Sequence, residues 1–223
     1  MVNELSHKPF RPQDLIDSLC RRLLPVSSAL STIAPKLVTG EVWDREYRRG
    51  DWDRLFSDDQ LAHYMMVLGY LMKIPSPAHI LEVGCGAGRL FELIKRVGFA
   101  SYLGIDISAE AINRATVHAV ETSRFEVADA YTFCPDRQFD VVIFNEVAYY
   151  FKNPADVLQR YAGFLRENGF MIVSMYEFFP ARLVWRRVGR VFRTVDTARV
   201  QNSKGHKWQI RLLSAPSRIR EKA

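Results

Sequence analysis

The 223-residue chain is predicted to be an α/β protein with a mostly parallel sheet, and three stretches carry that prediction. His79–Val83 and Tyr102–Ile105 are short apolar runs separated by a glycine-rich turn and by apolar residues at helical spacing. Phe139–Phe144 (FDVVIF) is apolar almost throughout, as expected for a central parallel strand that is buried on both faces. Because strands and helical patterns alternate along the chain, we expect helices on both faces of the sheet.

Several segments precede the first predicted strand. Met1–Gln13 has two prolines and little apolar pattern, so we expect a loosely held arm. Asp14–Leu30 places its apolar residues on one side of a helix, and Ser57–Lys73 repeats this pattern before two prolines end it. Glu41–Leu55 is crowded with aromatic and charged residues that fit no single period, which predicts either a loop that serves a site or a solvated loop with two buried aromatics. His63 lies near the edge of an apolar stripe, where we expect a packing or surface histidine.

A glycine turn follows the first predicted strand. Gly84, Gly86 and Gly88 form a GxGxG pattern, so the backbone can approach a ligand closely and adopt positive φ where needed. The helix that follows presents its N-terminus to the same place. Asp106 ends the second strand, where an acid can accept hydrogen bonds from two ribose hydroxyls.

Two residues beside this turn argue against a nicotinamide dinucleotide site. The fingerprint of such sites is GxGxxG, but position 89 holds Arg instead of the third glycine. Glu82 would repel a pyrophosphate, whereas it would suit a sulfonium cation and an amino group. A strand–turn–helix unit that binds no ligand is the purely structural alternative.

The middle of the chain continues the alternation of helices and strands. Ala109–Thr122 has one polar face and is preceded by Ser108, which we expect to cap the helix. Arg124–Ala128 alternates and predicts a third strand. Pro154–Asn168 predicts a helix with proline at its first position, which Gly169 should end.

The last third predicts a buried strand, a helix and a hairpin. Phe170–Met175 is the strand, and Thr194–Asn202 and Lys207–Leu213 alternate around a polar turn as the hairpin. Phe178–Phe192 is the helix, with an expected apolar side made of Phe179, Leu183, Val184, Val188, Val191 and Phe192. Its other side carries Arg182, Arg186, Arg187, Arg190 and Arg193.

Composition and charge limit the classes of function. The three cysteines Cys20, Cys85 and Cys134 are widely spaced and form neither a zinc pattern nor a disulfide framework, so we expect a reducing, cytoplasmic compartment. No apolar run approaches the roughly 20 residues of a membrane span. The formal net charge is +6, and residues 180–223 hold 12 Lys and Arg against two Asp and Glu. The positive charge is therefore a property of the C-terminal segment.

The GxGxG turn with its flanking acids resembles the first motifs of the class I S-adenosylmethionine-dependent methyltransferases. The resemblance implies S-adenosyl-L-methionine as cofactor and a Rossmann-like sheet of seven strands in the order 3-2-1-4-5-7-6, with the last strand antiparallel. It also implies three parts: residues 1–56 as arm, helix and covering segment, residues 57–214 as methyltransferase core, and residues 215–223 as a basic tail. The stretch LRENGFMIVS is similar to the family's LxPGGxLxxS, but it lacks the proline and the first glycine.

The resemblance also implies a set of cofactor contacts. Tyr47 and Trp52 would cover the methionine end, and Arg49 would hold its carboxylate. Asp129 would accept from the adenine amine, beside a backbone N–H of Ala130. The expected contacts are Tyr47, Arg49, Trp52, Glu82, Gly84, Cys85, Gly86, Gly88, Asp106, Ile107, Asp129, Ala130, Asn145 and Glu146.

Catalytic and acceptor residues are expected after the fourth strand and at the last hairpin. The run NEVAYYF, residues 145–151, looks like the SEVLYY run of nodulation-type and sugar-modifying methyltransferases. Glu146 is the first candidate for the base that deprotonates the acceptor, and His206 is the second. Tyr150 completes the expected catalytic set, and Tyr149, Tyr150, Trp52 and His206 form the expected acceptor pocket. We expect no metal, because Asn145 and Asn153 alone do not supply the Asp/Asn cluster of a metal-dependent catechol-type enzyme.

The leading function is methyl transfer to a hydroxyl or amine of a small molecule, such as a sugar, a glycolipid precursor or a secondary metabolite. A C-methyltransferase, an RNA or protein methyltransferase, and a non-catalytic cofactor-binding fold are the alternatives. The arginine-rich helix could meet an anionic membrane surface, a phosphorylated ligand or only water. Nucleic acid is disfavoured, because aromatic residues do not alternate with the basic ones. Both a monomer and a homodimer fit the sequence.

Overall fold

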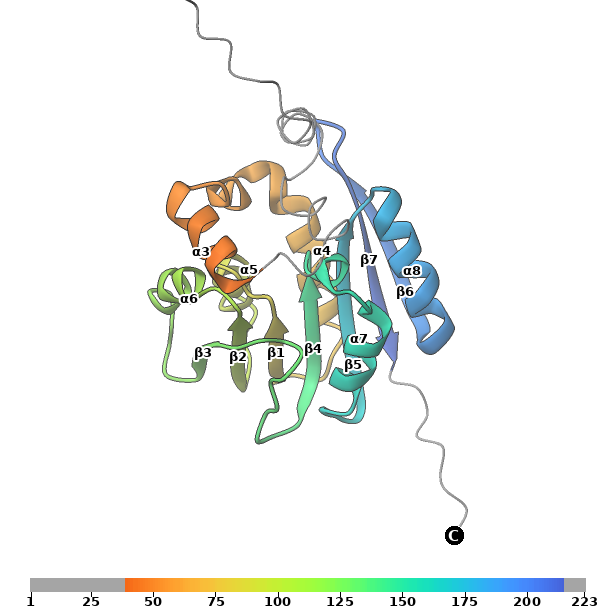
Figure 1. Cartoon of the computed structure of the whole chain (residues 1–223). Helices are drawn as coiled ribbons and strands as arrows, with labels where there is room; N and C mark the ends of the chain where they lie inside the picture. The colour runs from red at the N-terminus through yellow and green to blue at the C-terminus, as the bar shows by residue number, and fades with distance from the viewer. Residues whose placement is uncertain (1–38, 215–223) are drawn as a thin grey trace, which may run out of the picture.

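The computed structural model describes residues 39–214 (Figure 1). The arm and the helix expected over Met1–Leu30, and the basic tail, lie outside the described residues. One sheet has the strand order β3-β2-β1-β4-β5-β7-β6, which confirms the expected order. Strands β1 to β5 pair in parallel, and β7 is antiparallel to both β5 and β6. The strands are β1 His79–Val83, β2 Ser101–Asp106, β3 Ser123–Val127, β4 Phe139–Asn145, β5 Leu165–Tyr176, β6 Arg193–Gln201 and β7 Lys207–Ser214.

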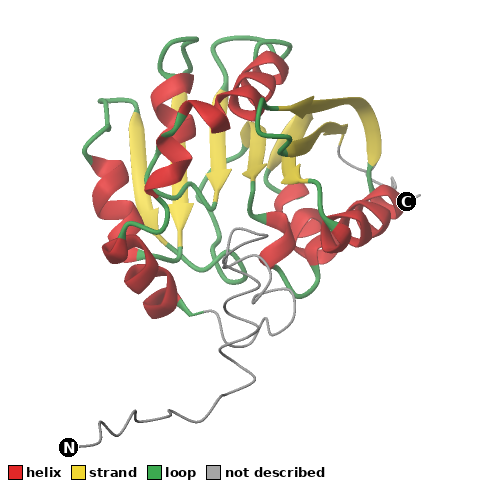
Figure 2. Cartoon of the chain, turned by 90° about the horizontal axis from the view of Figure 1, so that it is seen from above, coloured by secondary structure: helices red, strands yellow, loops and turns green. Residues whose placement is uncertain are grey.

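Helices cover both faces of this sheet (Figure 2). The α-helices are α3 Gly40–Arg49, α4 Leu61–Leu71, α5 Arg89–Ile94, α6 Ala109–Thr116, α7 Pro154–Ala162 and α8 Phe179–Val191. Short 3₁₀ turns are η2 Asp53–Phe56, η3 Asp58–Gln60 and η4 Ala148–Tyr150. Within residues 39–214, no helix is both long enough and apolar enough to cross a bilayer.

The central strands contribute side chains to two separate hydrophobic cores, one on each face of the sheet. In β4, Val141 and Ile143 pack with α4 and α5, whereas Val142 and Phe144 pack with α7 and α8. Successive side chains of a strand point to opposite faces, so both sets must be apolar when both faces are covered. This explains why FDVVIF reads as one nearly continuous apolar run.

The segment that the sequence predicted to be a covering loop is largely helical. Residues 40–49 form α3, and Gly50, at φ 78°, ends the helix in the left-handed conformation. Trp43 and Tyr47, one helical turn apart, pack toward the same cluster, which also holds Trp52. Only this narrow stripe is buried, so the charged residues between the aromatics hide the helical period in the sequence.

Two predicted helices end several residues earlier than expected. The helix from Ala109 ends at Thr116, and the helix from Pro154 ends at Ala162 instead of Asn168. Gly163 follows the second helix, and β5 then begins at Leu165, which pairs with Phe139 of β4. The prediction that Gly169 ends this helix is therefore wrong, because residues 165–169 already belong to the strand.

His63 is a packing residue. Its ring is fully buried and stacks on Trp208 of β7 at a centroid distance of 4.9 Å. Burial lowers the pKa of His63 to about 3, so the ring is neutral at physiological pH. This contact joins α4 to the C-terminal hairpin.

Candidate functional site

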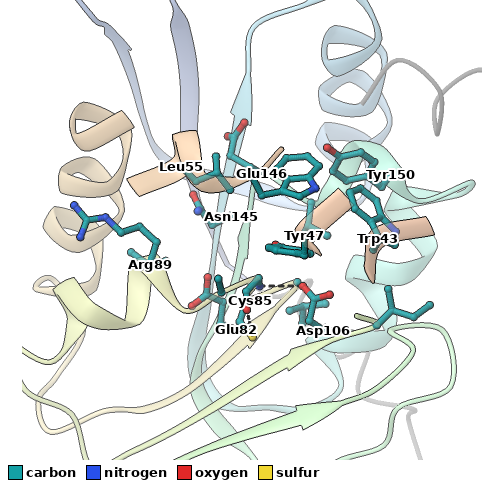
Figure 3. Close-up of a pocket in the computed structure, with 18 of the residues that line it drawn as sticks. Trp43, Tyr47, Leu55, Glu82, Cys85, Arg89, Asp106, Asn145, Glu146 and Tyr150 are labelled. Atoms are coloured by element: carbon teal, nitrogen blue, oxygen red, sulfur yellow. Dashed lines mark hydrogen bonds between the residues drawn. The ribbon is translucent and has the colours of Figure 1, made fainter. Parts of the chain in front are cut away.

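A cavity of about 660 Å³ lies beyond the carboxyl ends of β1, β2 and β4. Ligands of open α/β sheets bind at this edge, and pockets for small molecules have volumes of roughly 300–1,000 Å³. Figure 3 shows Glu82, Cys85 and Asp106 together on one side of the cavity, with Trp43 and Tyr150 close to one another. The covering segment, the glycine turn, the loops after β3 and β4, and the start of β7 all contribute to its lining.

The glycine turn has no room for side chains at two of its positions. A Cβ on Gly84, at φ 71°, would lie 2.5 Å from Cγ2 of Val147. A Cβ on Gly86, at φ 54°, would lie 2.7 Å from the hydroxyl oxygen of Tyr47. The backbone N–H groups of Gly84 and Cys85 both donate to the carbonyl of Ile105, which fixes the turn against β2.

Gly88 has a different role from the other two glycines. It does not line the cavity, although we expected it to contact the cofactor. It is the N-cap of α5 at φ 80°, and a Cβ there would lie 3.2 Å from Ala115 of α6. The third glycine therefore permits close packing of two helices.

Asp106 is held in place by the backbone around it. One carboxylate oxygen accepts from the N–H of Gly86 and the other from the N–H of Ser108, each at 2.9 Å. Burial raises the pKa of Asp106, and these N–H donors oppose that rise. A carboxylate has about four acceptor sites, so Asp106 keeps capacity to accept from a ligand hydroxyl.

Glu82 is a deeply buried acid on the same side of the cavity. Its carboxylate accepts from the hydroxyl of Tyr102 at 2.5 Å. Burial raises the pKa of Glu82 to about 8, against the opposing effect of this hydrogen bond. A cationic ligand group nearby would favour the ionised form.

The covering segment reaches across the cavity through aromatic contacts. The ring of Trp43 lies 4.9 Å from that of Tyr150 and 5.5 Å from that of Trp52. The indole N–H of Trp52 donates to Glu46 at 3.1 Å. Arg114 of α6 donates to the backbone carbonyl of Tyr47, so a hydrogen bond also joins the covering segment to α6.

Glu146 connects the ends of β4 and β5. Its carboxylate accepts from the Tyr149 hydroxyl at 3.0 Å, the Ser174 hydroxyl at 2.9 Å and the Tyr176 N–H at 3.0 Å. Burial raises the pKa of Glu146 to about 7, although all three donors lower it. Its φ of 59° is a strained conformation for a residue other than glycine, and such strain is common at functional sites.

Neighbouring hydrogen bonds determine which nitrogen of His206 carries its hydrogen. The carbonyl oxygen of the Asn202 side chain accepts from the backbone N–H groups of Lys204 and His206, which fixes the orientation of this amide. The amide nitrogen then faces Nδ1 of His206 at 3.2 Å and donates to it. In the neutral ring Nε2 therefore bears the hydrogen, and His206 is a hydrogen-bond donor at the cavity.

The remaining expected site residues also lie at the cavity. They are Arg49, Ile107, Asp129, Ala130, Asn145, Tyr149 and Tyr150. Asp129 accepts from the N–H of Tyr131 at 2.9 Å. The side-chain oxygen of Asn145 is buried and has no hydrogen-bond partner among residues 39–214, so it is available to a ligand group.

Several residues that line the cavity were not among the expected site residues. They include Phe56, Gln60, Tyr64, Arg89, Tyr176 and Trp208. Tyr64 belongs to a helical stripe that predicts core packing, and Trp208 belongs to an alternating strand. Only the strand order places them beside the glycine turn, so no local signal could have identified them.

A family model described as "Methyltransferase domain" matches residues 45–214. A ubiquinone biosynthesis O-methyltransferase of Shewanella halifaxensis is 33% identical over 100 residues, which are 43% of this chain and 42% of the relative. A relative of the same name from Bradyrhizobium diazoefficiens is 34% identical over 98 residues, which are 43% of this chain and 38% of the relative. The chain thus spans about two fifths of the length of these curated relatives.

Two solved structures share the fold. The N-methyltransferase NodS from Bradyrhizobium japonicum WM9, in complex with S-adenosyl-L-homocysteine, superposes with a TM-score of 0.66 at 16% identity. This match covers 74% of this chain and 92% of NodS. Magnesium protoporphyrin IX methyltransferase from Synechocystis PCC 6803, with bound S-adenosylmethionine, gives a TM-score of 0.60 at 15% identity and covers 80% and 98% of the two chains.

Proposed function

The chain belongs to the methyltransferase-domain family, and from this we propose that it transfers a methyl group from S-adenosyl-L-methionine to a hydroxyl or amine of a small molecule. The observation that carries the proposal is the convergence of the glycine turn, Asp106 and Glu82 on one cavity. The printed names of the relatives, an O-methyltransferase and an N-methyltransferase, support oxygen and nitrogen as the acceptor atoms. A sugar, a glycolipid precursor or a secondary metabolite is the proposed acceptor, and the cytoplasm is the proposed compartment.

The residues at the cavity fit this cofactor. When bound, S-adenosyl-L-methionine supplies a methyl group on a positively charged sulfur. Asp106 is proposed to accept from the ribose hydroxyls, because its carboxylate lines the cavity and retains acceptor capacity beside its backbone donors. Asp129 is proposed to accept from the adenine amine, and Arg49 to hold the methionine carboxylate. Gly84 and Gly86 carry no side chain and line the cavity, which fits close approach of a ligand to their backbone.

We propose Glu146 as the residue that takes the proton from the acceptor. One of its oxygens accepts two hydrogen bonds, from Tyr149 and Tyr176, and therefore has no remaining lone pair. The other oxygen accepts from the Ser174 hydroxyl, and we propose that this oxygen takes the proton. A pKa of about 7 suits a base that works near neutral pH.

His206 is proposed to position the acceptor. Its Nδ1 already accepts from Asn202, so the neutral ring offers a donor and no free lone pair. Tyr149, Tyr150 and Trp52 are proposed to form the walls around the acceptor. These aromatic rings would also exclude water from the reacting atoms.

Two experiments test the proposal. Calorimetry with S-adenosyl-L-homocysteine should detect binding, whereas heat from a nicotinamide dinucleotide and none from this ligand would refute the cofactor assignment. Methyl-labelled S-adenosyl-L-methionine should then transfer label to oxygen or nitrogen in a panel of hydroxylated and aminated small molecules. Label found on carbon, or on RNA or protein only, would refute the proposed acceptor class.

A further inference from the structure

The outer face of α8 differs from the face that the sequence predicted. Ala181, Val184, Trp185 and Val188 are buried against the molecule. Phe179 and Leu183, which we expected on this apolar side, are 71% and 45% exposed. They lie on the arginine side of the helix, so the outer face combines two apolar side chains with a set of cations. This outer face consists of Phe179, Arg182, Leu183, Arg186, Arg187 and Arg190.

The charge on this face is not balanced within the described part of the chain. The helix contains no acidic residue, and Arg193 adds a further exposed cation directly after it. None of these five arginines has an ion pair among residues 39–214. Arg114, Arg166 and Arg199 elsewhere on the surface each pair with a carboxylate; Arg48 and Arg49 of α3 do not pair with one among the described residues, but α3 also contains acidic residues, which α8 lacks. A ligand of α8 is therefore expected to be anionic.

We propose that the outer face of α8 docks the protein onto an anionic lipid surface. An interfacial helix places apolar side chains below the headgroups and basic side chains on the phosphates, and this face offers both. With 13 residues α8 lies along such a surface and does not cross it. An RNA face would need several aromatic rings in register with the cations, and this face holds one, Phe179.

The position of α8 links this surface to the cavity. Phe178 precedes the helix, and its ring lies 5.2 Å from the ring of Tyr149, which lines the cavity. Docking through α8 would thus hold the cavity close to the lipid headgroups. The docking proposal does not depend on the proposed function, since it rests on the helix alone.

Co-sedimentation with lipid vesicles tests the proposal. The full chain should bind vesicles of phosphatidylcholine and phosphatidylglycerol at 3:1 and not vesicles of phosphatidylcholine alone. Binding should weaken as salt is raised, because exposed charges are screened. Arg186→Glu with Arg187→Glu should weaken binding by at least about fivefold for each positive charge lost. Phe179→Ser with Leu183→Ser should also weaken it, since apolar insertion is lost.

Matched variants distinguish this face from net charge and general hydrophobicity. Lys95→Glu with Arg96→Glu changes the same number of charges in two adjacent exposed residues after α5 and should retain binding. Val117→Ser removes an apolar side chain that is 82% exposed elsewhere, and it should also retain binding. Thermal melts should show that every variant is folded.

Three results would overturn the proposal. The first is that the wild type fails to bind the anionic vesicles at low salt. The second is that the Lys95 and Arg96 double variant loses as much binding as the Arg186 and Arg187 double variant. The third is that Arg218→Glu with Arg220→Glu, in the basic tail, abolishes binding while the α8 variants retain it. A gel shift with RNA in the absence of vesicle binding would assign the face to nucleic acid instead.

Discussion

Glu82 and Glu146 are carboxylates at one cavity, but their surroundings assign them different roles. Glu82 has one donor, Tyr102, and burial raises its pKa to about 8. Glu146 has three donors, and its pKa rises only to about 7. Hydrogen bonds to the ionised form lower a carboxyl pKa, which explains the smaller rise. Glu146 is therefore the better candidate for a proton acceptor at neutral pH.

Asp106→Ala should weaken S-adenosyl-L-homocysteine binding at least tenfold. The loss of a charged hydrogen-bond acceptor is worth about 1–3 kcal/mol, and the backbone N–H groups of Gly86 and Ser108 also lose their partner. Isothermal titration calorimetry measures the change. Asp136→Ala, which removes an exposed acid outside the cavity, should leave the affinity unchanged. Equal affinities of the wild type and Asp106→Ala would remove Asp106 from the cofactor site.

Glu146→Gln should slow turnover by about 10²–10⁴-fold while it preserves cofactor affinity. In the wild type the rate should rise with pH through an apparent pKa near 7, because only the ionised carboxylate accepts a proton. The variant should lose this dependence. A pH–rate profile on the first acceptor identified measures both effects. An unchanged profile in the variant would show that Glu146 is not the base.

Glu82→Gln should stabilise the ligand-free protein increasingly as pH rises from 5 to 8. The pKa of Glu82 is higher in the folded than in the unfolded chain, so the folded state holds more protons over this range. Stability then falls with rising pH, and the neutral amide escapes this loss, which is on the order of a few kcal/mol. Urea unfolding at several pH values measures the difference from wild type. Glu167→Gln, at an exposed position, gives the baseline; a variant curve parallel to wild type would contradict the prediction.

At the level of elements, steric contacts constrain the glycine turn. Gly84 and Gly98 both have positive φ, but only Gly84 has neighbours within reach of an added Cβ. The two positions therefore separate the effect of backbone strain from that of a steric clash.

Gly98→Ala should destabilise the protein by about 1–2 kcal/mol through strain alone. Gly84→Ala should cost more, because its Cβ would also collide with Val147 at 2.5 Å and displace the loop after β4. Urea midpoints measure stability, and calorimetry should show reduced ligand binding for Gly84→Ala only. Similar losses of stability and binding in both variants would show that Val147 does not constrain the turn.

The elements with strong local signals could be predicted from the sequence. The strands from His79 and Phe139 begin where expected, and Ser108 caps α6 by accepting from the N–H of Ala111. The α3 helix was missed, because only a narrow aromatic stripe of it is buried. The end of α7 was misplaced, because Gly163 and Gly169 both look like helix stops and only strand pairing distinguishes them.

For the candidate site, the sequence could identify the residues near the glycine turn, but it could not identify Tyr64 and Trp208. Glu82 is the penultimate residue of β1, Asp106 ends β2 and Glu146 follows β4, so the sequence predicts their place at the carboxyl edge of the sheet. Tyr64 of α4 and Trp208 of β7 also line the cavity. The sequence does not show this, because the position of β7 depends on the order of the strands in the sheet. His63, stacked on Trp208, is part of the same long-range contact.

At the level of the whole molecule, tertiary contacts connect the C-terminal hairpin to the segment before α4. The side chain of Asn202 donates to the carbonyl of Asp59, and Lys204 forms an ion pair with the Asp59 carboxylate. The same Asn202 orients His206 at the cavity. One asparagine thus supports both the closure of the fold and the orientation of a candidate acceptor contact. The hairpin is therefore part of the site.

The position of β7 between β5 and β6 has a consequence for synthesis on the ribosome. Within residues 39–214, the last strand along the chain, β7, lies inside the sheet, so β6 leaves the exit tunnel before its neighbour has been made. Until β7 follows, the edge of β5 presents unpaired backbone groups, which is a hazard for aggregation. A nascent chain that stalls before residue 207 would therefore be a substrate for chaperones and proteases.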